Sequence, residues 1–317
     1  MSENVIELES RLNSSLNSAE RLNILMELAT QYANDDFVES WKYALEAMSL
    51  AEVGKDREME AKAHETLAQS LRKLAEYSDA LEHFESALDN FLGLGDLYAV
   101  ARCYCGMGIV YGSLEEYRTA LECFEEGLSA SRRANRASLA ATLTGNIGHV
   151  YFNMGRYQDA LDCFQHSYDF YKEKDNSQGA GNMIGGMAGI YVFQGEYSKG
   201  LEFVRRAYQL HRKAKDQQGI AVSQMNIGLT YHKMGDMERA EAELTKALNY
   251  ARSVSYKVIE YDTLKHLSQV YNELDKQEKS RECLQLYLEG SREEKKLEVQ
   301  RKKEQMRKRQ SIRYSQS

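Results

Sequence analysis

A period of 40 residues runs through most of this 317-residue chain and limits it to a repeated structural unit. Five tyrosines mark the period: Tyr111, Tyr151, Tyr191, Tyr231 and Tyr271. Three positions before each tyrosine stands a small residue, in the series Gly108, Gly148, Ala188, Gly228 and Ser268. A chain with such a register is expected to fold as an array of similar units, each packed on its neighbours.

Each period contains two stretches with apolar residues at helical spacing, separated by a short break such as 154–156. In the first stretch Gly148 and Tyr151 share one face, so a neighbouring backbone can approach beside the small residue. In the second stretch Ala160 and Phe164 belong to one apolar stripe. A hairpin of two such helices cannot bury its apolar face alone, whereas stacked hairpins bury a continuous core.

The segment MGIVYGSLEEYRTALECFEEGL at 107–128 recurs as IGHVYFNMGRYQDALDCFQHSY at 147–168, and this pattern resembles the tetratricopeptide repeat (TPR) family. The pattern is similar to the TPR regions of bacterial signalling proteins, and this resemblance implies an all-α solenoid, a right-handed superhelix of about seven helix-turn-helix hairpins. We expect a lead-in at 1–18, a TPR array at 19–293 and a basic tail at 294–317. The predicted repeats lie near 19–54, 58–94, 98–134, 138–174, 178–214, 218–254 and 258–293.

The absence of proline bears on how these helices end. The common TPR unit has about 34 residues, and we expect the extra residues here to lengthen the second helix and the loop that follows it. TPR units often have a proline at the end of the second helix, and this chain has none. The helices are therefore expected to stop at Gly93, Gly95, Asn135, Asp175–Asn176 and Asp216, with looser connections between repeats.

No constellation of residues in the sequence points to catalysis, to a metal or to a cofactor. The glycines at 185–189 lack the preceding strand and the Lys-Ser/Thr pair of a phosphate loop. Cys103 and Cys105 are two apart on a predicted helix, so their side chains diverge, and the seven histidines show no metal-ligand spacing. We therefore expect a protein that is not an enzyme and needs no cofactor.

The sequence also bears on location. The N-terminal segment has no signal-peptide pattern, and no apolar run is long enough to span a membrane. Five cysteines in a chain of this length do not indicate a disulfide framework, which favours a reducing compartment. We predict a cytoplasmic protein.

The resemblance implies a binding surface, because the first helix of each TPR hairpin lines the concave groove of the superhelix. We expect that groove to bind a protein or peptide ligand. The predicted groove residues are Arg102, Ile109, Asn146, His149, Phe152, Asn153, Asn182, Gly186, Gly189, Phe193, Met225, Asn226, Leu229, His232 and Lys233.

Two features of this surface have competing interpretations. Glycine within a helix costs about 0.8–1 kcal/mol relative to alanine. Gly145, Gly185, Gly186 and Gly189 therefore either permit close helix packing or leave room for a ligand backbone. Asn146 and Asn226 share one repeat position, where an amide can donate and accept hydrogen bonds with a peptide main chain. Alternatively, these amides are solvated or bond within the protein.

Charge is divided between an acidic body and a basic tail. The chain has 41 Lys and Arg against 48 Asp and Glu, which gives a net charge of −7. From Ser291 onward there are ten basic and four acidic residues, a charge of +6, which leaves −13 for the remainder. A solvated helix is the favoured interpretation of the tail. A dimerising coiled coil and an anionic partner are the alternatives, and self-association is left open.

Three functional hypotheses follow. The favoured one is a non-enzymatic scaffold that binds a peptide or partner segment in its groove, in signalling or complex assembly. The second is a peptide-responsive regulator of a response regulator or output enzyme, like the intracellular pheromone receptors of Gram-positive bacteria, although the short lead-in leaves little room for a catalytic N-terminal bundle. The third is a nucleic-acid-binding adaptor acting through the tail.

Overall fold

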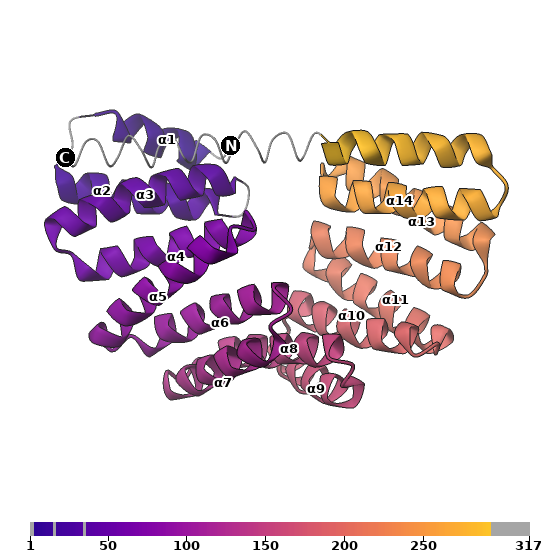
Figure 1. Ribbon diagram of the computed structural model, residues 1–317, viewed down its shortest axis with the longest axis horizontal. Coiled ribbons are helices and arrows are strands. Elements are labelled where there is room, and N and C mark those ends of the chain that lie inside the picture. Colours follow the sequence, from indigo (N-terminus) through magenta and orange to yellow (C-terminus); the bar gives the residue numbers. More distant parts are fainter. Residues whose placement is uncertain (1–2, 15–16, 34–35, 293–317) are drawn as a thin grey trace. The chain divides into compact units, whose positions relative to one another are not determined.

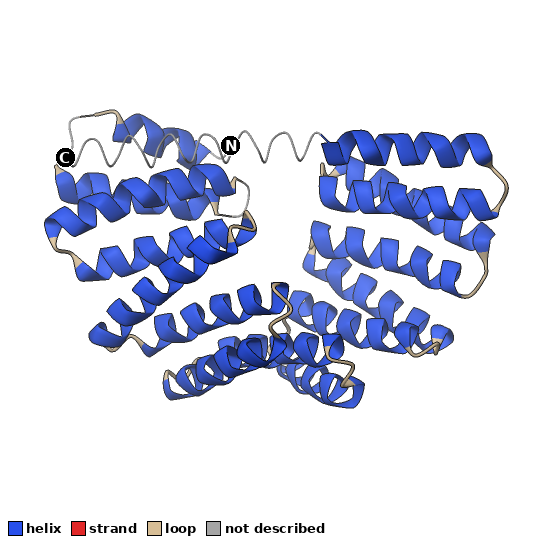
Figure 2. Cartoon of the chain, viewed as in Figure 1, coloured by secondary structure: helices blue, strands red, loops and turns tan. Residues whose placement is uncertain are grey.

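The computed structural model describes residues 3–14, 17–33 and 36–292, and every regular element in these ranges is a helix (Figures 1 and 2). The predicted tail at 294–317 lies outside the described residues. The helices are α1 (Glu3–Leu12), α2 (Ser18–Tyr32), α3 (Phe37–Gly54), α4 (Arg57–Lys73), α5 (Tyr77–Leu94), α6 (Leu97–Ser113), α7 (Tyr117–Arg133), α8 (Ala137–Asn153), α9 (Tyr157–Glu173), α10 (Ser177–Phe193), α11 (Tyr197–Ala214), α12 (Gln217–Lys233), α13 (Met237–Ser253) and α14 (Lys257–Glu273), followed by helical residues 277–292.

These helices pack as consecutive pairs. The most extensive contacts join the partners of a hairpin, such as α4 with α5 and α10 with α11. First helices of successive hairpins also touch, as α4 does with α6 and α12 with α14. The predicted all-α solenoid of stacked hairpins is confirmed. None of the helices in the described part of the chain has the length and apolar character that crossing a bilayer requires.

Each 40-residue period divides evenly between its two helices. In the period that begins at Leu97, α6 and α7 each have 17 residues, and turns of three residues follow them at 114–116 and 134–136. The expectation of a longer second helix and a longer following loop was therefore wrong in part. Both helices are long, and the connection between repeats is as short as the turn within one.

A residue in the left-handed conformation ends each helix from α3 to α14, at intervals of 20 residues. At Gly95, where φ is +72°, the N–H donates to the Leu92 carbonyl, and the next N–H, of Asp96, donates to the Phe91 carbonyl. This pair of bonds is the Schellman motif, which satisfies carbonyl groups left open at a helix end. Each connection from the end of α3 to the helix at 277–292 is bonded in this way, so the looser connections expected from the absence of proline are not found there.

The residues at these stops are more varied than the sequence suggested. Gly95, Asn135 and Asp175 take the left-handed conformation as expected. Asp216 instead caps the start of α12, where its carboxylate accepts from the Gly219 N–H at 3.0 Å. Residues without a known preference for this conformation fill five of the other stops: Lys55, Ala75, Glu115, Lys215 and Ser255.

Ala75→Gly is expected to raise the melting temperature. The left-handed conformation costs an L-residue about 1–2 kcal/mol, and the freedom that glycine adds to the unfolded chain offsets about 0.4–1 kcal/mol of that gain. The matched reverse change is Gly155→Ala, at φ +77° in the equivalent turn of another repeat, and it is expected to lower the melting temperature. Thermal unfolding measures both changes, and shifts in the same direction would contradict this account.

Small residues that recur at intervals of 40 lie in the core of both helices of a hairpin. Ala80, Ala120 and Ala160 are fully buried. At Gly108 a Cβ atom would lie 2.5 Å from the ring of Phe124, which belongs to the second helix of the same hairpin. The small residue therefore lets the two helices approach closely, as the repeat pattern predicts.

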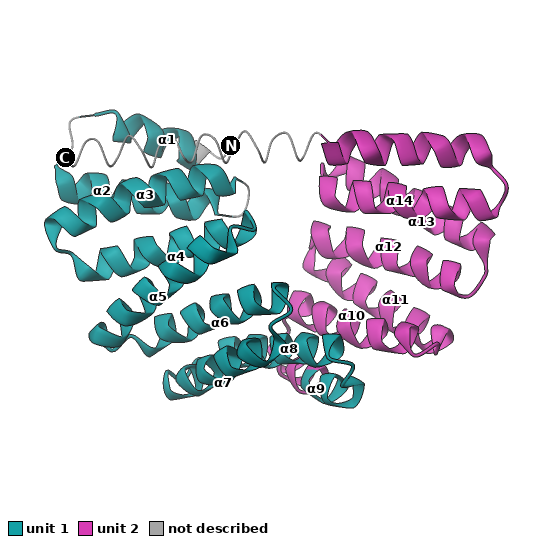
Figure 3. Cartoon of the chain, in the orientation of Figure 1, with its two compact units in different colours: residues 1–163 teal, residues 164–317 magenta. Residues whose placement is uncertain are grey.

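The described chain forms two compact units, Met1–Cys163 and Phe164–Ser317 (Figure 3). In the first unit α1 packs on α2 through a buried apolar cluster that includes Leu8 and Leu28. The Glu9 carboxylate accepts hydrogen bonds from the hydroxyl groups of Tyr32, at 2.8 Å, and Tyr43, at 3.1 Å. The second unit has its own apolar cluster, built by α10 to α14 and the helix at 277–292.

Candidate functional site

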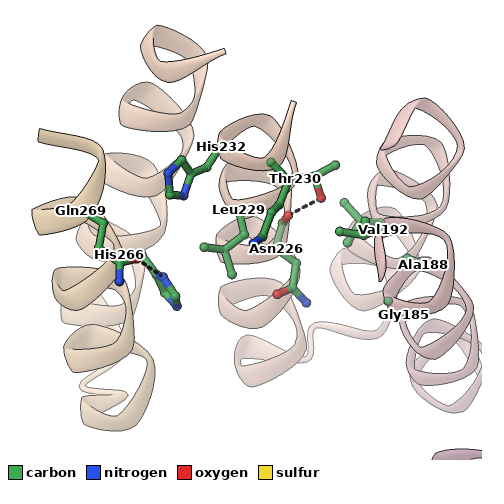
Figure 4. Close-up of a pocket in the computed structure, with 12 residues that line it drawn as sticks. Gly185, Ala188, Val192, Asn226, Leu229, Thr230, His232, His266 and Gln269 are labelled. Atoms are coloured by element: carbon green, nitrogen blue, oxygen red, sulfur yellow. Dashed lines mark hydrogen bonds between the residues drawn. The ribbon is translucent and has the colours of Figure 1, made fainter. Parts of the chain in front are cut away.

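In the second unit the first helices of three successive hairpins, α10, α12 and α14, line a pocket of about 290 Å³ (Figure 4). Its apolar surface comes from Ala188 and Val192 of α10, Leu229 of α12 and Val204 of α11. Its polar groups are Asn226, Thr230, His232, Lys233, His266 and Gln269. Ligand pockets in proteins commonly measure about 300–1,000 Å³, so this one has room for one or two side chains of a peptide.

Small side chains create this space. A Cβ atom built on Gly185 or Gly189 would meet nothing within 4 Å, so the surface of α10 is open at both positions. Val204 occupies the repeat position that phenylalanine holds in three earlier second helices, at Phe84, Phe124 and Phe164. The exchange of a phenyl ring for an isopropyl group leaves room between α10, α11 and α12.

The polar groups of the pocket lie on α12 and α14. Among the described residues, the side-chain amide of Asn226 has no hydrogen-bond partner, while its backbone carbonyl accepts from the Thr230 hydroxyl at 2.7 Å. Nδ1 of His266 lies 3.3 Å from Oε1 of Gln269, and Figure 4 marks both contacts. Burial lowers the pKa of His266, which favours a neutral ring at neutral pH. The pocket thus offers hydrogen-bonding groups beside an apolar surface.

Five of the groove residues predicted from the sequence meet at this pocket: Gly189, Asn226, Leu229, His232 and Lys233. Four predicted residues of the same unit do not line it. Met225 is buried in the core, whereas Asn182 and Phe193 are exposed outside the pocket, Phe193 to 67%. Gly186 is the fourth, and its environment shows why.

Gly186 is a packing residue. A Cβ atom there would lie 2.8 Å from Cζ of Phe164, whose side chain is fully buried. Because Phe164 belongs to α9, the second helix of the preceding hairpin, the glycine admits its ring between successive hairpins. Gly106 admits Phe84 in the same way. Of the two interpretations of these glycines, close helix packing therefore applies to Gly186. At Gly185 and Gly189 the absence of a side chain instead leaves open space at the pocket.

In the first unit Arg102 and Asn146 bond within the protein. Arg102 forms an ion pair with Glu65, and its guanidinium lies over the ring of Tyr98, 5.1 Å from the centroid. Nδ2 of Asn146 donates to Sγ of Cys105 at 3.5 Å. Of the two interpretations of the asparagines, an intramolecular role thus describes Asn146. The amide of Asn226 lines the pocket, and its contact with a ligand stays a prediction.

The remaining predicted residues of the first unit lie along α6 and α8. Ile109 packs partly buried against an apolar cluster, and the ring of Phe152 lies 5.9 Å from that of Tyr157. His149 and Asn153 are exposed. None of these four residues lines the pocket of α10, α12 and α14, and their part in binding stays a prediction.

The comparisons with known proteins agree with this architecture. A tetratricopeptide repeat profile matches residues 138–213 and 219–293, and a second one matches 101–133. The chain belongs to the tetratricopeptide repeat family. No curated protein matches the sequence closely enough to count as a relative.

Several solved TPR structures superpose on the chain. A Rap protein complexed with competence and sporulation factor is 17% identical, with 94% of this chain and 80% of that one covered and a TM-score of 0.72. The Rap conjugation gene regulator of plasmid pLS20, in complex with the Phr* peptide, is 13% identical, with coverage of 90% and 79% and a TM-score of 0.67. Aspartyl phosphate phosphatase F from Bacillus subtilis is 14% identical, with coverage of 91% and 73% and a TM-score of 0.69. At these identities the likeness shows the TPR fold.

The repeat register could have identified Gln269, a pocket residue that was not predicted from the sequence. Gln269 stands 40 and 80 residues after Leu229 and Gly189, which both line the pocket. The same first-helix position therefore faces the pocket in three successive repeats. Val204 was missed because it lies on a second helix, and only the break in the phenylalanine series distinguishes it.

The cysteines of this TPR array are buried or partly buried and none is in a disulfide. Burial raises the pKa of Cys105, Cys123 and Cys163 to about 11. Their thiols therefore stay protonated at neutral pH, and the thiolate is the reactive form. Their environment fits small apolar packing residues rather than nucleophiles or metal ligands.

Proposed function

We propose that this TPR protein is a non-enzymatic interaction scaffold that binds a peptide or a partner segment at the pocket formed by α10, α12 and α14. The observation that carries the proposal is the amide of Asn226, which lies at an apolar pocket with its hydrogen-bonding groups unused. An amide in that state can donate to a main-chain carbonyl and accept from a main-chain N–H of the same ligand.

The chemistry of the surroundings supports a peptide as ligand. Ala188, Val192 and Leu229 offer apolar surface to a side chain, and Gly185 and Gly189 let a backbone approach α10 closely. Structurally similar TPR proteins have been solved with competence and sporulation factor and with the Phr* peptide. That likeness supports peptide binding here.

Asn226→Ala is expected to weaken peptide binding by about 2- to 10-fold, the equivalent of one or two net hydrogen bonds. The melting temperature is expected to stay within about a degree of the parent's, because the amide bonds nothing in the fold. An array of immobilised short peptides, probed with the full chain, supplies a ligand, and fluorescence anisotropy then measures its affinity. The matched control is Asn182→Ala, an exposed asparagine of α10 outside the pocket, which is expected to bind as the parent does.

We also consider a peptide-responsive regulator, and the superposition with aspartyl phosphate phosphatase F favours it. In that case the chain would capture a response regulator or an output enzyme, and a peptide in the pocket would change the capture. The test is affinity capture from the native host with and without the peptide found on the array. Dephosphorylation of a captured response regulator, measured with the purified chain, would overturn the non-enzymatic part of the first proposal.

A further inference from the structure

Four side chains with metal-binding chemistry meet at the junction of α3, α4 and α5 in the first unit. One ligand atom each of Glu52, Glu60 and His64 lies within 4.8 Å of the others. Nδ1 of His64 lies 2.9 Å from Nδ1 of His83, and the two rings have centroids 5.0 Å apart. Two carboxylates and two imidazoles thus occupy one small volume, and none of them belongs to the unit that holds the pocket.

The fold builds this cluster from local rules. Glu60 and His64 are four residues apart on α4, and this spacing places them on one face of the helix. The left-handed residue Lys55 ends α3 and reverses the chain, so that Glu52 of α3 returns beside the start of α4. The next turn brings α5 alongside α4, and with it His83.

The electrostatics of the cluster favour a cation. Among the described residues neither the Glu52 carboxylate nor the Glu60 carboxylate takes part in an ion pair. A neutral imidazole has the lone pair that a metal needs, and a divalent cation would offset the repulsion between the carboxylates.

We propose that Glu52, Glu60 and His64 are the protein ligands of a divalent transition-metal ion, with Zn²⁺ as the ion used to test it. Zinc holds carboxylate oxygen and imidazole nitrogen at about 2.0–2.2 Å from the ion, and the ligand atoms here already lie within 4.8 Å of one another. The imidazole selects against Mg²⁺ and Ca²⁺, which prefer oxygen ligands.

His83 acts in this site as a positioning residue. When Nδ1 of His64 carries the proton and donates it to Nδ1 of His83, Nε2 of His64 keeps its lone pair for the metal. Such a hydrogen bond fixes the tautomer and the orientation of a ligating imidazole. The bound ion ties α3 of one hairpin to α4 of the next, so metal binding is expected to stabilise this junction.

Equilibrium dialysis of the full chain against Zn²⁺, with the bound metal determined by mass spectrometry, tests the site. We expect one Zn²⁺ per chain at this site and a rise in melting temperature, with no comparable uptake of Mg²⁺. Glu60→Gln and His64→Ala are each expected to weaken Zn²⁺ binding by about tenfold or more, since each removes a ligand. His83→Phe is expected to weaken it about 10- to 100-fold, the effect typical of residues that orient a metal ligand.

The matched control is Glu58→Gln, on the same helix, whose carboxylate pairs with Lys62 at 2.6 Å instead of facing the cluster. It is expected to bind Zn²⁺ as the parent does. If His64→Ala does not fold, Glu60→Gln still tests the site. The Glu60 side chain is only half-buried, so its replacement is expected to leave the fold intact. No uptake by the parent, or parent-like affinity in Glu60→Gln, would overturn the proposal, because the ion would then be absent or bound elsewhere.

Discussion

Gly189→Leu is expected to weaken peptide binding by about 10- to 100-fold while leaving the protein as stable as before or more so. The space above Gly189 is open to at least 4 Å, and it is part of the pocket surface. A leucine side chain would fill the volume that a ligand needs, at a cost typical of overpacking, about 1–3 kcal/mol in the complex. In the free protein the same change replaces a helical glycine, and this replacement is expected to raise the free energy of unfolding by about 0.5–1 kcal/mol.

Two measurements separate these effects. Anisotropy with the array-derived peptide gives the affinity, and urea unfolding gives the free energy of unfolding. Gly93→Leu is the matched control, because Gly93 of α5 also has nothing within 4 Å of a built Cβ and lies outside the pocket. That control is expected to keep the parent affinity. Undiminished binding by Gly189→Leu would contradict the placement of the ligand.

Gly186→Leu, three residues away on the same helix, is expected to have the opposite outcome. The new side chain would overlap the ring of Phe164, which is fully buried and cannot move into solvent. After the gain in helix propensity is subtracted, we expect the free energy of unfolding to fall by about 1–2 kcal/mol. Because each hairpin of a solenoid depends on its neighbours, the loss should be visible as a lower urea midpoint for the repeats that flank α10.

A double-mutant cycle tests the cause. Phe164→Ala alone is expected to cost about 3–5 kcal/mol through the cavity that it leaves. When Gly186→Leu is combined with Phe164→Ala, the introduced leucine enters that cavity, so the combined loss is expected to be smaller than the sum by about 1–3 kcal/mol. Strict additivity of the two changes would show that the introduced side chain does not compete with the ring for space.

The contrast between these two glycines marks the limit of sequence reasoning about the groove. Gly186 and Gly189 both fall on the first-helix positions that line a TPR groove, and the repeat register alone treats them alike. Which one is open depends on the ring of Phe164, whose conformation is set by contacts between hairpins. The pocket likewise depends on Val204. This valine stands where three earlier repeats have phenylalanine, and its smaller side chain leaves space between the helices.

The asparagines show the same limit. Asn146 and Asn226 are equivalent in the sequence, and the structure separates them because, among the described residues, Cys105 accepts a hydrogen bond from one and nothing does so for the other. The cluster of Glu52, Glu60, His64 and His83 is a further case. No metal-ligand spacing was seen in the sequence, since Glu52 and His83 lie on helices either side of α4 and only the turns bring them to His64.

The sequence by itself determined that this protein is helical, that its helices pair into hairpins and that the hairpins repeat every 40 residues. Those properties depend on spacings of a few residues along one helix and on small residues in register, and both are local to the chain. Only the tertiary structure decided that both helices share the extra length, that every helix from α3 to α14 ends in a bonded left-handed turn, and which residues surround the pocket and form the proposed metal site. These depend on how side chains from different helices divide the space between them, and spacing along one helix does not specify that division.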